Sequence, residues 1–196
     1  MSKPKSTAAR PAEGQIRIIG GRLRGSRLPV PDLPGLRPSS DRMRETLFNW
    51  LMHEVAGRHC LDLFAGSGAL GFEAASRGAE RVLMIEREPR VARSLVDSAQ
   101  RLQTAVDVHT GDALAWLQGA STRRFDLAFV DPPFAAGLTE RVLELLPAHL
   151  GARAWVYLET APCPLPVLPA GWSLHRELVT RQACGRLFRV ESEASL

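Results

Sequence analysis

Four consecutive residues combine an acid, two prolines and an aromatic ring: Asp131, Pro132, Pro133 and Phe134. They follow the mostly apolar run 125–130, which is typical of a strand buried on both faces of a parallel sheet. Prolines cannot donate to a sheet and keep their neighbours extended, so the carboxylate and the adjacent carbonyls point in fixed directions. Fixed acceptors beside a flat ring suit a planar base that carries an amino group. A simple strand-ending turn is the alternative that these residues leave open.

A glycine-rich loop stands upstream, directly after the apolar run 60–64. Gly66, Gly68 and Gly71 have the spacing G-x-G-x-x-G, and Glu86 ends the next apolar run. In a strand, loop, helix and strand unit, such glycines let the backbone approach a ligand, and the acid accepts hydrogen bonds from ribose hydroxyls. We therefore expect a nucleoside-type cofactor. The alternative is a tight turn with a solvated acid.

The glycine loop alone does not separate NAD from S-adenosylmethionine, because both present an adenosine ribose to the acid. The chain of 196 residues is short for a dehydrogenase with a second domain, and no histidine beside a later strand end offers a proton relay. Asp112 is placed to accept from an adenine amino group, with the Ala113 amide facing a ring nitrogen. Asp62 falls at the same edge, where ligands of such sheets gather. These features favour S-adenosylmethionine.

Positive charge is concentrated in the first 44 residues, although the whole chain carries only +4. This segment holds ten basic and three acidic residues, whereas the remainder holds 15 basic and 18 acidic residues. Such asymmetry indicates a basic arm that lies against a polyanion. A solvated charged surface is the alternative.

The arm begins with a hairpin pattern. Two short runs, 15–19 and 22–28, flank the glycine pair 20–21, and paired glycines supply the positive φ that a two-residue turn needs. With a period of two, Arg22 and Arg24 fall on one face of the second strand. We expect both side chains to be available to phosphates.

A helix follows the hairpin after a proline-rich stretch. Residues 39–41 are candidate N-caps, and the helical spacing extends to about Val55. Arg42 and Arg44 stand in the first turn, off the predicted apolar stripe and free for phosphate. The residues of that stripe are Met43, Leu47, Trp50 and Leu51.

Strand and helix patterns then alternate to the end of the chain. We predict an α/β fold with a doubly wound, mostly parallel, Rossmann-like sheet of seven strands, an antiparallel C-terminal hairpin, and the small N-terminal hairpin and helix as an extension. The expected strands are 60–64, 81–85, 106–109, 125–130, 153–159, 173–180 and 187–190. The expected parts are a disordered basic tail (1–14), an RNA-binding extension (15–56) and a catalytic domain (57–196).

Several stretches resemble a known family. Leu-Asp-Leu-Phe-Ala-Gly-Ser-Gly at 61–68 and the acid, prolines and phenylalanine at 131–134 resemble S-adenosylmethionine-dependent amino-methyltransferases. Ile-Arg-Ile-Ile-Gly-Gly-Arg-Leu-Arg-Gly at 16–25 and Leu-Arg-Pro-Ser-Ser-Asp-Arg-Met-Arg-Glu-Thr-Leu-Phe-Asn-Trp-Leu at 36–51 resemble, more narrowly, the bacterial RsmD family, which methylates N2 of a guanine in 16S ribosomal RNA. The resemblance spans about 14–190. Arginines replace the expected lysines at 181–186, which puts in doubt at most a C-terminal RNA contact.

The resemblance implies roles for individual residues. The catalytic group comprises Asp131, Pro132, Pro133 and Phe134, with the acid and the Pro132 carbonyl holding the guanine amine and the ring stacking on the base. The cofactor group comprises Asp62, Phe64, Ala65, Gly66, Gly68, Glu86, Asp112, Ala113 and Asp131. The RNA-binding group comprises Arg22, Arg24, Arg37, Arg42 and Arg44.

The resemblance also implies a partner, 16S rRNA within the small ribosomal subunit or its assembly intermediate. We expect a cytoplasmic monomer without a membrane segment, because no apolar run is long enough to span a bilayer. The three cysteines and five histidines show no metal-ligand spacing, so no metal is expected. The remaining alternatives are an adenine-N6 or other nucleic-acid amino-methyltransferase, an NAD-dependent oxidoreductase, and an RNA-binding protein with a relic cofactor pocket.

Overall fold

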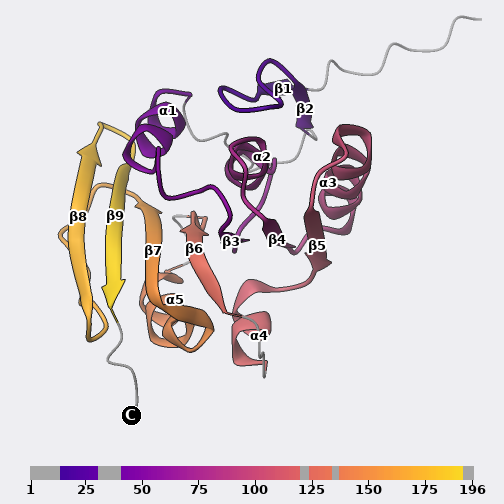
Figure 1. Cartoon of the computed structure of the whole chain (residues 1–196). Coiled ribbons are helices and arrows are strands. Elements are labelled where there is room, and N and C mark those ends of the chain that lie inside the picture. Colours follow the sequence, from indigo (N-terminus) through magenta and orange to yellow (C-terminus); the bar gives the residue numbers. More distant parts are fainter. Residues whose placement is uncertain (1–13, 31–40, 120–123, 134–136, 192–196) are drawn as a thin grey trace, which may run out of the picture.

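The computed structural model describes residues 14–30, 41–119, 124–133 and 137–191. A seven-stranded sheet carries helices on both faces, and a two-stranded sheet lies beside helix α2 (Figure 1). The elements in chain order are β1 (Gly14–Arg17), β2 (Arg27–Val30), α1 (Asp41–Trp50), β3 (His59–Asp62), α2 (Ala69–Ser76), β4 (Arg81–Glu86), α3 (Pro89–Leu102), β5 (Val106–Thr110), α4 (Ala113–Gln118), β6 (Phe125–Val130), α5 (Thr139–Leu145), the 3-10 helix η2 (Leu146–His149), β7 (Leu150–Thr160), β8 (Trp172–Val179) and β9 (Cys184–Glu191).

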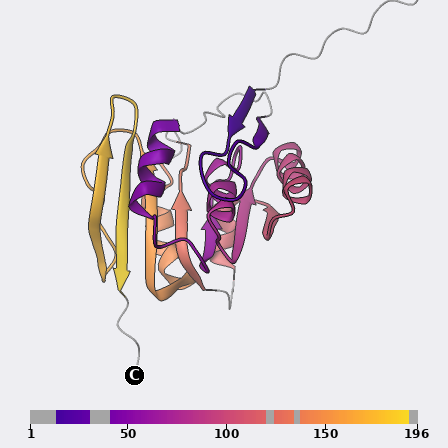
Figure 2. The same cartoon turned by 45° about the horizontal axis from the view of Figure 1, so that its top comes forward.

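The large sheet has the strand order β5-β4-β3-β6-β7-β9-β8. The first five of these strands are parallel, and β9 runs antiparallel to both β7 and β8. Figure 2 shows the yellow antiparallel strands at one end of the molecule and α3 at the other. The predicted fold class is therefore confirmed. The strand order reverses between β3 and β6, which is where ligands bind in sheets of this kind.

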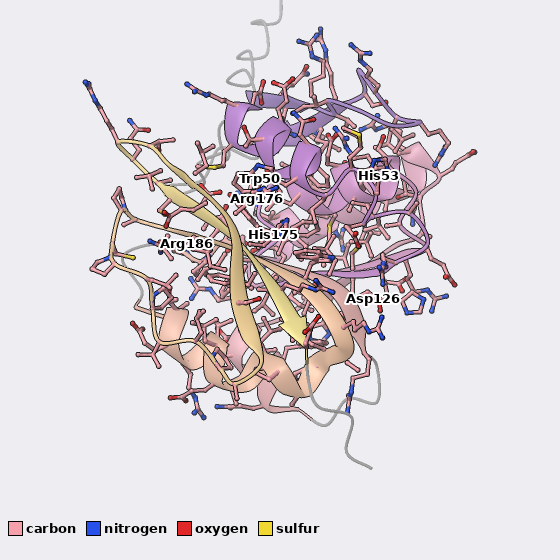
Figure 3. All side chains as sticks on the ribbon, turned by 60° about the vertical axis from the view of Figure 1, so that its left-hand side comes forward. Trp50, His53, Asp126, His175, Arg176 and Arg186 are labelled. Carbon is pink, nitrogen blue, oxygen red and sulfur yellow. The ribbon has the colours of Figure 1, made fainter. Side chains whose placement is uncertain are left out.

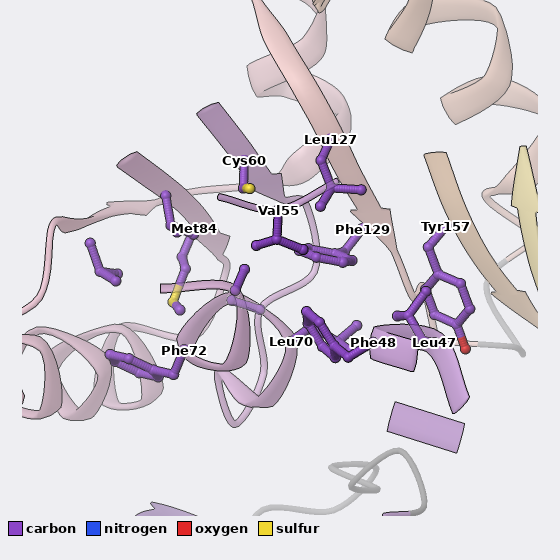
Figure 4. Packing of buried hydrophobic residues seen from close by; sticks show 14 of the residues in the cluster. Leu47, Phe48, Val55, Cys60, Leu70, Phe72, Met84, Leu127, Phe129 and Tyr157 are labelled. Carbon is purple, nitrogen blue, oxygen red and sulfur yellow. The ribbon is translucent and has the colours of Figure 1, made fainter. Parts of the chain in front are cut away.

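Two hydrophobic cores hold the helices on the sheet. Helices α1, α2 and α3 cover one face, and α4 and α5 cover the other. In the first core, the rings of Phe48 from α1 and Phe129 from β6 lie with their centroids 5.8 Å apart, and Phe72 of α2 belongs to the same cluster (Figure 4). All three are fully buried. Each such side chain contributes about 1.5–3 kcal/mol of transfer free energy to folding.

The N-terminal hairpin is present, but its predicted turn is wrong. Gly14 pairs with Val30 and Arg17 pairs with Arg27, so the strands are joined by the long connection 18–26. The glycine pair at 20–21 lies on α2 and not in a two-residue turn. The reason is steric: Gly21 has φ +74°, and a Cβ there would collide with the Ser76 carbonyl oxygen.

Helix α1 begins at Asp41 as predicted, but ends at Trp50, before the expected Val55. After Trp50 the backbone forms tighter turns, since the Glu54 amide donates to the Leu51 carbonyl, three residues back. The expected stripe at Met43, Leu47 and Leu51 is buried, whereas Trp50 is half-buried beside the last strands (Figure 3).

The expectation that Arg44 is free for phosphate is wrong. Its side chain is 1% exposed, and Nη2 donates to the Arg17 carbonyl at 3.1 Å and to Asp41 at 2.6 Å. Arg44 stands three and four residues before Leu47 and Phe48, so it lies on the buried face of α1. Arg42 is exposed, as expected.

Arg186 is also a structural arginine, in the segment where arginines replace the expected lysines. It is 3% exposed, its Nε donates to Glu177 at 2.7 Å, and its Nη2 donates to the Cys163 carbonyl at 2.6 Å (Figure 3). It therefore fixes the β7–β8 connection to β9. None of the helices in the described part of the chain has the length and apolarity to cross a bilayer.

We predict that Arg44→Ala lowers the free energy of unfolding by about 2–4 kcal/mol, because it removes a buried side chain together with its hydrogen bonds. The matched control is Arg42→Ala in the same turn, which is expected to change stability by less than about 0.5 kcal/mol. Chemical denaturation of both variants measures the difference. Equal stabilities would contradict the role assigned to Arg44.

Candidate active site

The candidate site lies where the parallel strands end. Asp62 is the last residue of β3 and pairs in register with Met84 and Phe129 of the neighbouring strands. Glu86 closes β4, and Asp131 follows β6 directly. Because parallel strands end at a common edge, these three acids share one rim of the sheet.

The glycines that follow β3 are needed for different physical reasons. A Cβ on Gly68 would lie 2.6 Å from Leu95, and one on Gly71 would collide with Met84, so both glycines allow α2 to pack closely. Gly66 differs, because the nearest atom to its Cβ would be the Phe64 carbonyl oxygen at 3.9 Å. Its backbone has φ +50° and faces open space, which fits the close approach of a ligand.

Glu86 ties this loop to the neighbouring strand. Its Oε2 accepts from the Gly66 amide at 2.8 Å, and its Oε1 accepts from the Glu88 amide at 2.7 Å. The Ala65 amide donates to the Ile85 carbonyl at 3.0 Å. The carboxylate is half-buried and fixed in direction, so it is not the freely solvated acid of the alternative interpretation.

Asp112 and Ala113 stand at the neighbouring strand end. The Gly111 amide donates to the Glu86 carbonyl at 2.9 Å, which keeps the two ends together. Asp112 caps α4, since its Oδ1 accepts from the Ala115 amide at 3.0 Å. The side chain of Asp112 is exposed, while Ala113 is buried. An adenine contact at this position stays a prediction.

Asp62 is 2% exposed, and its Oδ2 accepts from the Gly71 amide at 2.9 Å. Burial raises the pKa of its carboxyl from 3.8 to about 7; the Gly71 hydrogen bond opposes this shift, and the charge of Glu86 adds to it. The ionised form is therefore costly unless a positive group approaches.

Asp131 is half-buried, Pro132 is buried and Pro133 is exposed. Phe134 lies outside the described residues, as does Arg37. Two residues of β7 near Asp131 were not predicted from the sequence. The Tyr157 hydroxyl donates to Glu159 at 2.8 Å, and both residues are buried.

Burial is the largest cause that raises the Tyr157 pKa above its usual range; the charge and hydrogen bond of Glu159 come next, and the charges of Asp131 and Cys184 add to them. The phenol thus stays protonated near Asp131. Tyr157 and Glu159 are two residues apart at the end of a parallel strand, a spacing that places both on one face. That spacing was the signal available in the sequence.

The chemistry of the rim suits a cationic nucleoside. Carboxyl groups of Asp62, Glu86 and Asp112 surround a glycine loop whose Gly66 position is open, so ribose hydroxyls and a positive group have acceptors there. The pyrophosphate of NAD would meet these acids at the same edge. Among the described residues, no group of three or more His, Cys, Asp or Glu side chains is arranged to hold a metal ion.

Comparison with known proteins agrees with this geometry. The family model described as "Conserved hypothetical protein 95" matches residues 16–189. The chain belongs to this family. It is 45% identical to Ribosomal RNA small subunit methyltransferase D of Escherichia coli K12 over 98% of this chain and 97% of that protein. The protein of the same name from Haemophilus influenzae is 41% identical, over 91% and 95%.

A solved structure of a putative methyltransferase from Escherichia coli superposes with a TM-score of 0.86 at 45% identity, covering 92% of this chain and 100% of that one. Family membership confirms the resemblance to the RsmD family and identifies the chain as a methyltransferase. It does not test the individual site residues, which stay predictions.

We predict that the stability difference between the wild type and Asp62→Asn depends on pH. The folded pKa is about 7 and the ordinary value is 3.8, so the folded chain holds this proton more tightly than the unfolded chain does. Wild-type stability relative to the variant is therefore highest below about pH 4 and falls by roughly 2–4 kcal/mol as pH rises towards 7.

Denaturant titrations at several pH values measure this difference, and Asp107→Asn at an exposed position serves as the matched control. A difference between wild type and Asp62→Asn that is flat, or that grows with pH, would contradict the raised pKa of Asp62.

Proposed function

We propose that the chain transfers a methyl group from S-adenosylmethionine to the exocyclic N2 of a guanine in 16S rRNA of the small ribosomal subunit. The observation that carries this proposal is the common rim: Asp131 and Pro132 follow β6 beside the loop that Glu86 holds through Gly66. The names of the relatives support ribosomal RNA as the carrier of the base. We further propose a cytoplasmic monomer that acts on the subunit or its assembly intermediate.

The fixed groups of the rim define how the cofactor is held. When bound, S-adenosylmethionine supplies a methyl group on a positively charged sulfur. Glu86 would accept from the ribose hydroxyls, and Gly66 would allow the backbone to lie against the ligand. Asp112 and Ala113 would bind the adenine. Asp62 would lie near the methionyl end, where a positive ammonium group would stabilise its ionised form. Phe64, Ala65, Gly68 and Asp131 would complete the set.

The target amine needs help from the protein, because its lone pair is delocalised into the guanine ring. The Asp131 carboxylate and the Pro132 carbonyl each accept one N–H, which turns the lone pair out of the ring plane and stabilises the positive charge that develops on nitrogen. Pro132 and Pro133 hold these acceptors in place, since neither can rotate about φ. The buried Tyr157 and Glu159 support the part of the site that contains Asp131.

The base reaches Asp131 and Pro132 only after leaving its RNA stack, at a cost of about a few kcal/mol. Stacking on Phe134 offsets part of that cost in this proposal. Arg22, Arg24 and Arg42 are exposed. We assign phosphate contacts to these three arginines and to Arg37. Arg44 does not, because it is buried.

The function predicts that wild-type protein, small ribosomal subunits and labelled S-adenosylmethionine yield label on one guanine, at N2. Asp131→Ala is expected to lose at least about a hundredfold in turnover, because one fixed acceptor is removed, while cofactor affinity falls far less, because the other residues of the cofactor set remain. Nucleoside analysis and calorimetric titration measure the two quantities. Label on adenine N6 would assign the alternative base, and near wild-type turnover of Asp131→Ala would overturn the role of this acid.

A second prediction concerns the arm. Replacing Arg22, Arg24 and Arg42 together is expected to weaken RNA binding and to reduce the slope of log affinity against log salt by about 1 for each lost phosphate contact. Cofactor affinity should not change. Arg153→Ala, an exposed arginine near the amino end of β7, is the control. If the salt slope were unchanged, the arm would be merely solvated.

A further inference from the structure

One buried carboxylate joins the arm to the catalytic body. Glu73 lies in α2 and is fully buried. Its Oε2 accepts from the Ile19 amide and its Oε1 from the Gly20 amide, both at 2.8 Å. Oε1 also accepts from Arg77 Nε at 2.8 Å, which balances the charge. A buried carboxylate with this many donors is stable only while all of them stay in place.

Ser76, in the next turn of α2, binds the same loop, and we call Glu73 and Ser76 together the clamp. The Ser76 hydroxyl donates to the Gly20 carbonyl and accepts from the Leu23 amide at 2.8 Å. The Ser76 carbonyl accepts from the Arg22 amide at 2.7 Å. Gly21 passes so close to this carbonyl that no side chain fits. The two residues before Gly21 and the two after it are therefore bonded to two positions of one helix.

The clamped loop displays arginines. Leu23 is buried, whereas Arg22 and Arg24 on either side of it are exposed. Arg22 Nη2 donates to the Gln103 carbonyl at 3.3 Å, and Arg101 Nη2 donates to the Arg27 carbonyl at 2.8 Å. Among the described residues, no carboxylate forms an ion pair with Arg22 or Arg24, and both side chains are exposed.

The same helix begins at the cofactor loop. Gly68 is the N-cap of α2, and Gly71 in its first turn bonds to Asp62. Ser76 is the last residue, so the helix spans eight residues, or about 12 Å. The glycine loop and the loop 18–26, which carries Arg22 and Arg24, are thus attached to opposite ends of one short helix.

We propose that Glu73 is a positioning residue for the RNA substrate. It holds the loop 18–26 at a fixed distance from the cofactor loop, so that the phosphates bound by Arg22 and Arg24 determine which nucleotide reaches Asp131. The role rests on the proposed function, since it requires RNA as substrate. Glu73 touches neither base nor cofactor; it acts through the loop.

The test compares two glycines of the same loop. Gly21→Ala pushes the loop off Ser76, whereas Gly25→Ala adds the same methyl group at a similar positive φ, where no atom lies within 4 Å. Gly21→Ala should raise the KM for RNA on the order of tenfold and spread the label over additional nucleotides, with kcat and cofactor affinity within about twofold of wild type. Gly25→Ala should match wild type, and Glu73→Gln should follow Gly21→Ala.

The outcomes separate the two levels of the proposal. If wild-type protein labels no RNA, the proposed function fails before the variants are compared. If wild-type protein labels RNA and Gly21→Ala behaves like Gly25→Ala, only the positioning role fails. Equal losses of cofactor and RNA binding in Gly21→Ala and Glu73→Gln would also overturn it, because the clamp would then serve the stability of the body alone.

Discussion

The close approach of helix α2 to strands β3 and β4 is the constraint on which the remaining arrangement depends. Gly71 is the contact point: its amide donates to Asp62, and any side chain there would collide with Met84. Because helix α2 lies this close to the sheet, Gly66 comes within hydrogen-bonding distance of Glu86, and the C-terminal half of the helix reaches the N-terminal loop. One tight contact in the centre thus fixes both the cofactor loop and the arm.

Most of the sheet could be predicted because its signals are local. Apolar runs of the right length, glycines and prolines mark strand ends, and parallel order brings those ends to one rim. Asp62, Glu86 and Asp131 were placed at this rim from sequence alone, and the fold agrees. The proton on Asp62 was not predictable, since it depends on how completely α2 covers the carboxyl group.

The predictions from the sequence were wrong where a local pattern is explained by a contact with residues far away in the chain. The glycine pair at 20–21 has the composition of a two-residue turn, yet it accommodates a helix more than fifty residues away. Arg44 was predicted to lie off the apolar stripe, yet Leu47 and Phe48, three and four residues further on, place it on the buried face of α1. The i, i+2 spacing of Tyr157 and Glu159 is visible in the sequence, but their proximity to Asp131 arises only once β7 lies beside β6.

The bonds from Glu73 and Ser76 to the loop 18–26 also define what can be exchanged between relatives. An N-terminal arm transplanted by itself would lose the helix face that shapes it, and a new α2 would meet the wrong loop. The modular unit is discontinuous in sequence: it comprises the arm and one side of α2. During divergence, substitutions at 19–23 and at 73–76 are therefore expected to change together, as do the two halves of an interface between separate proteins.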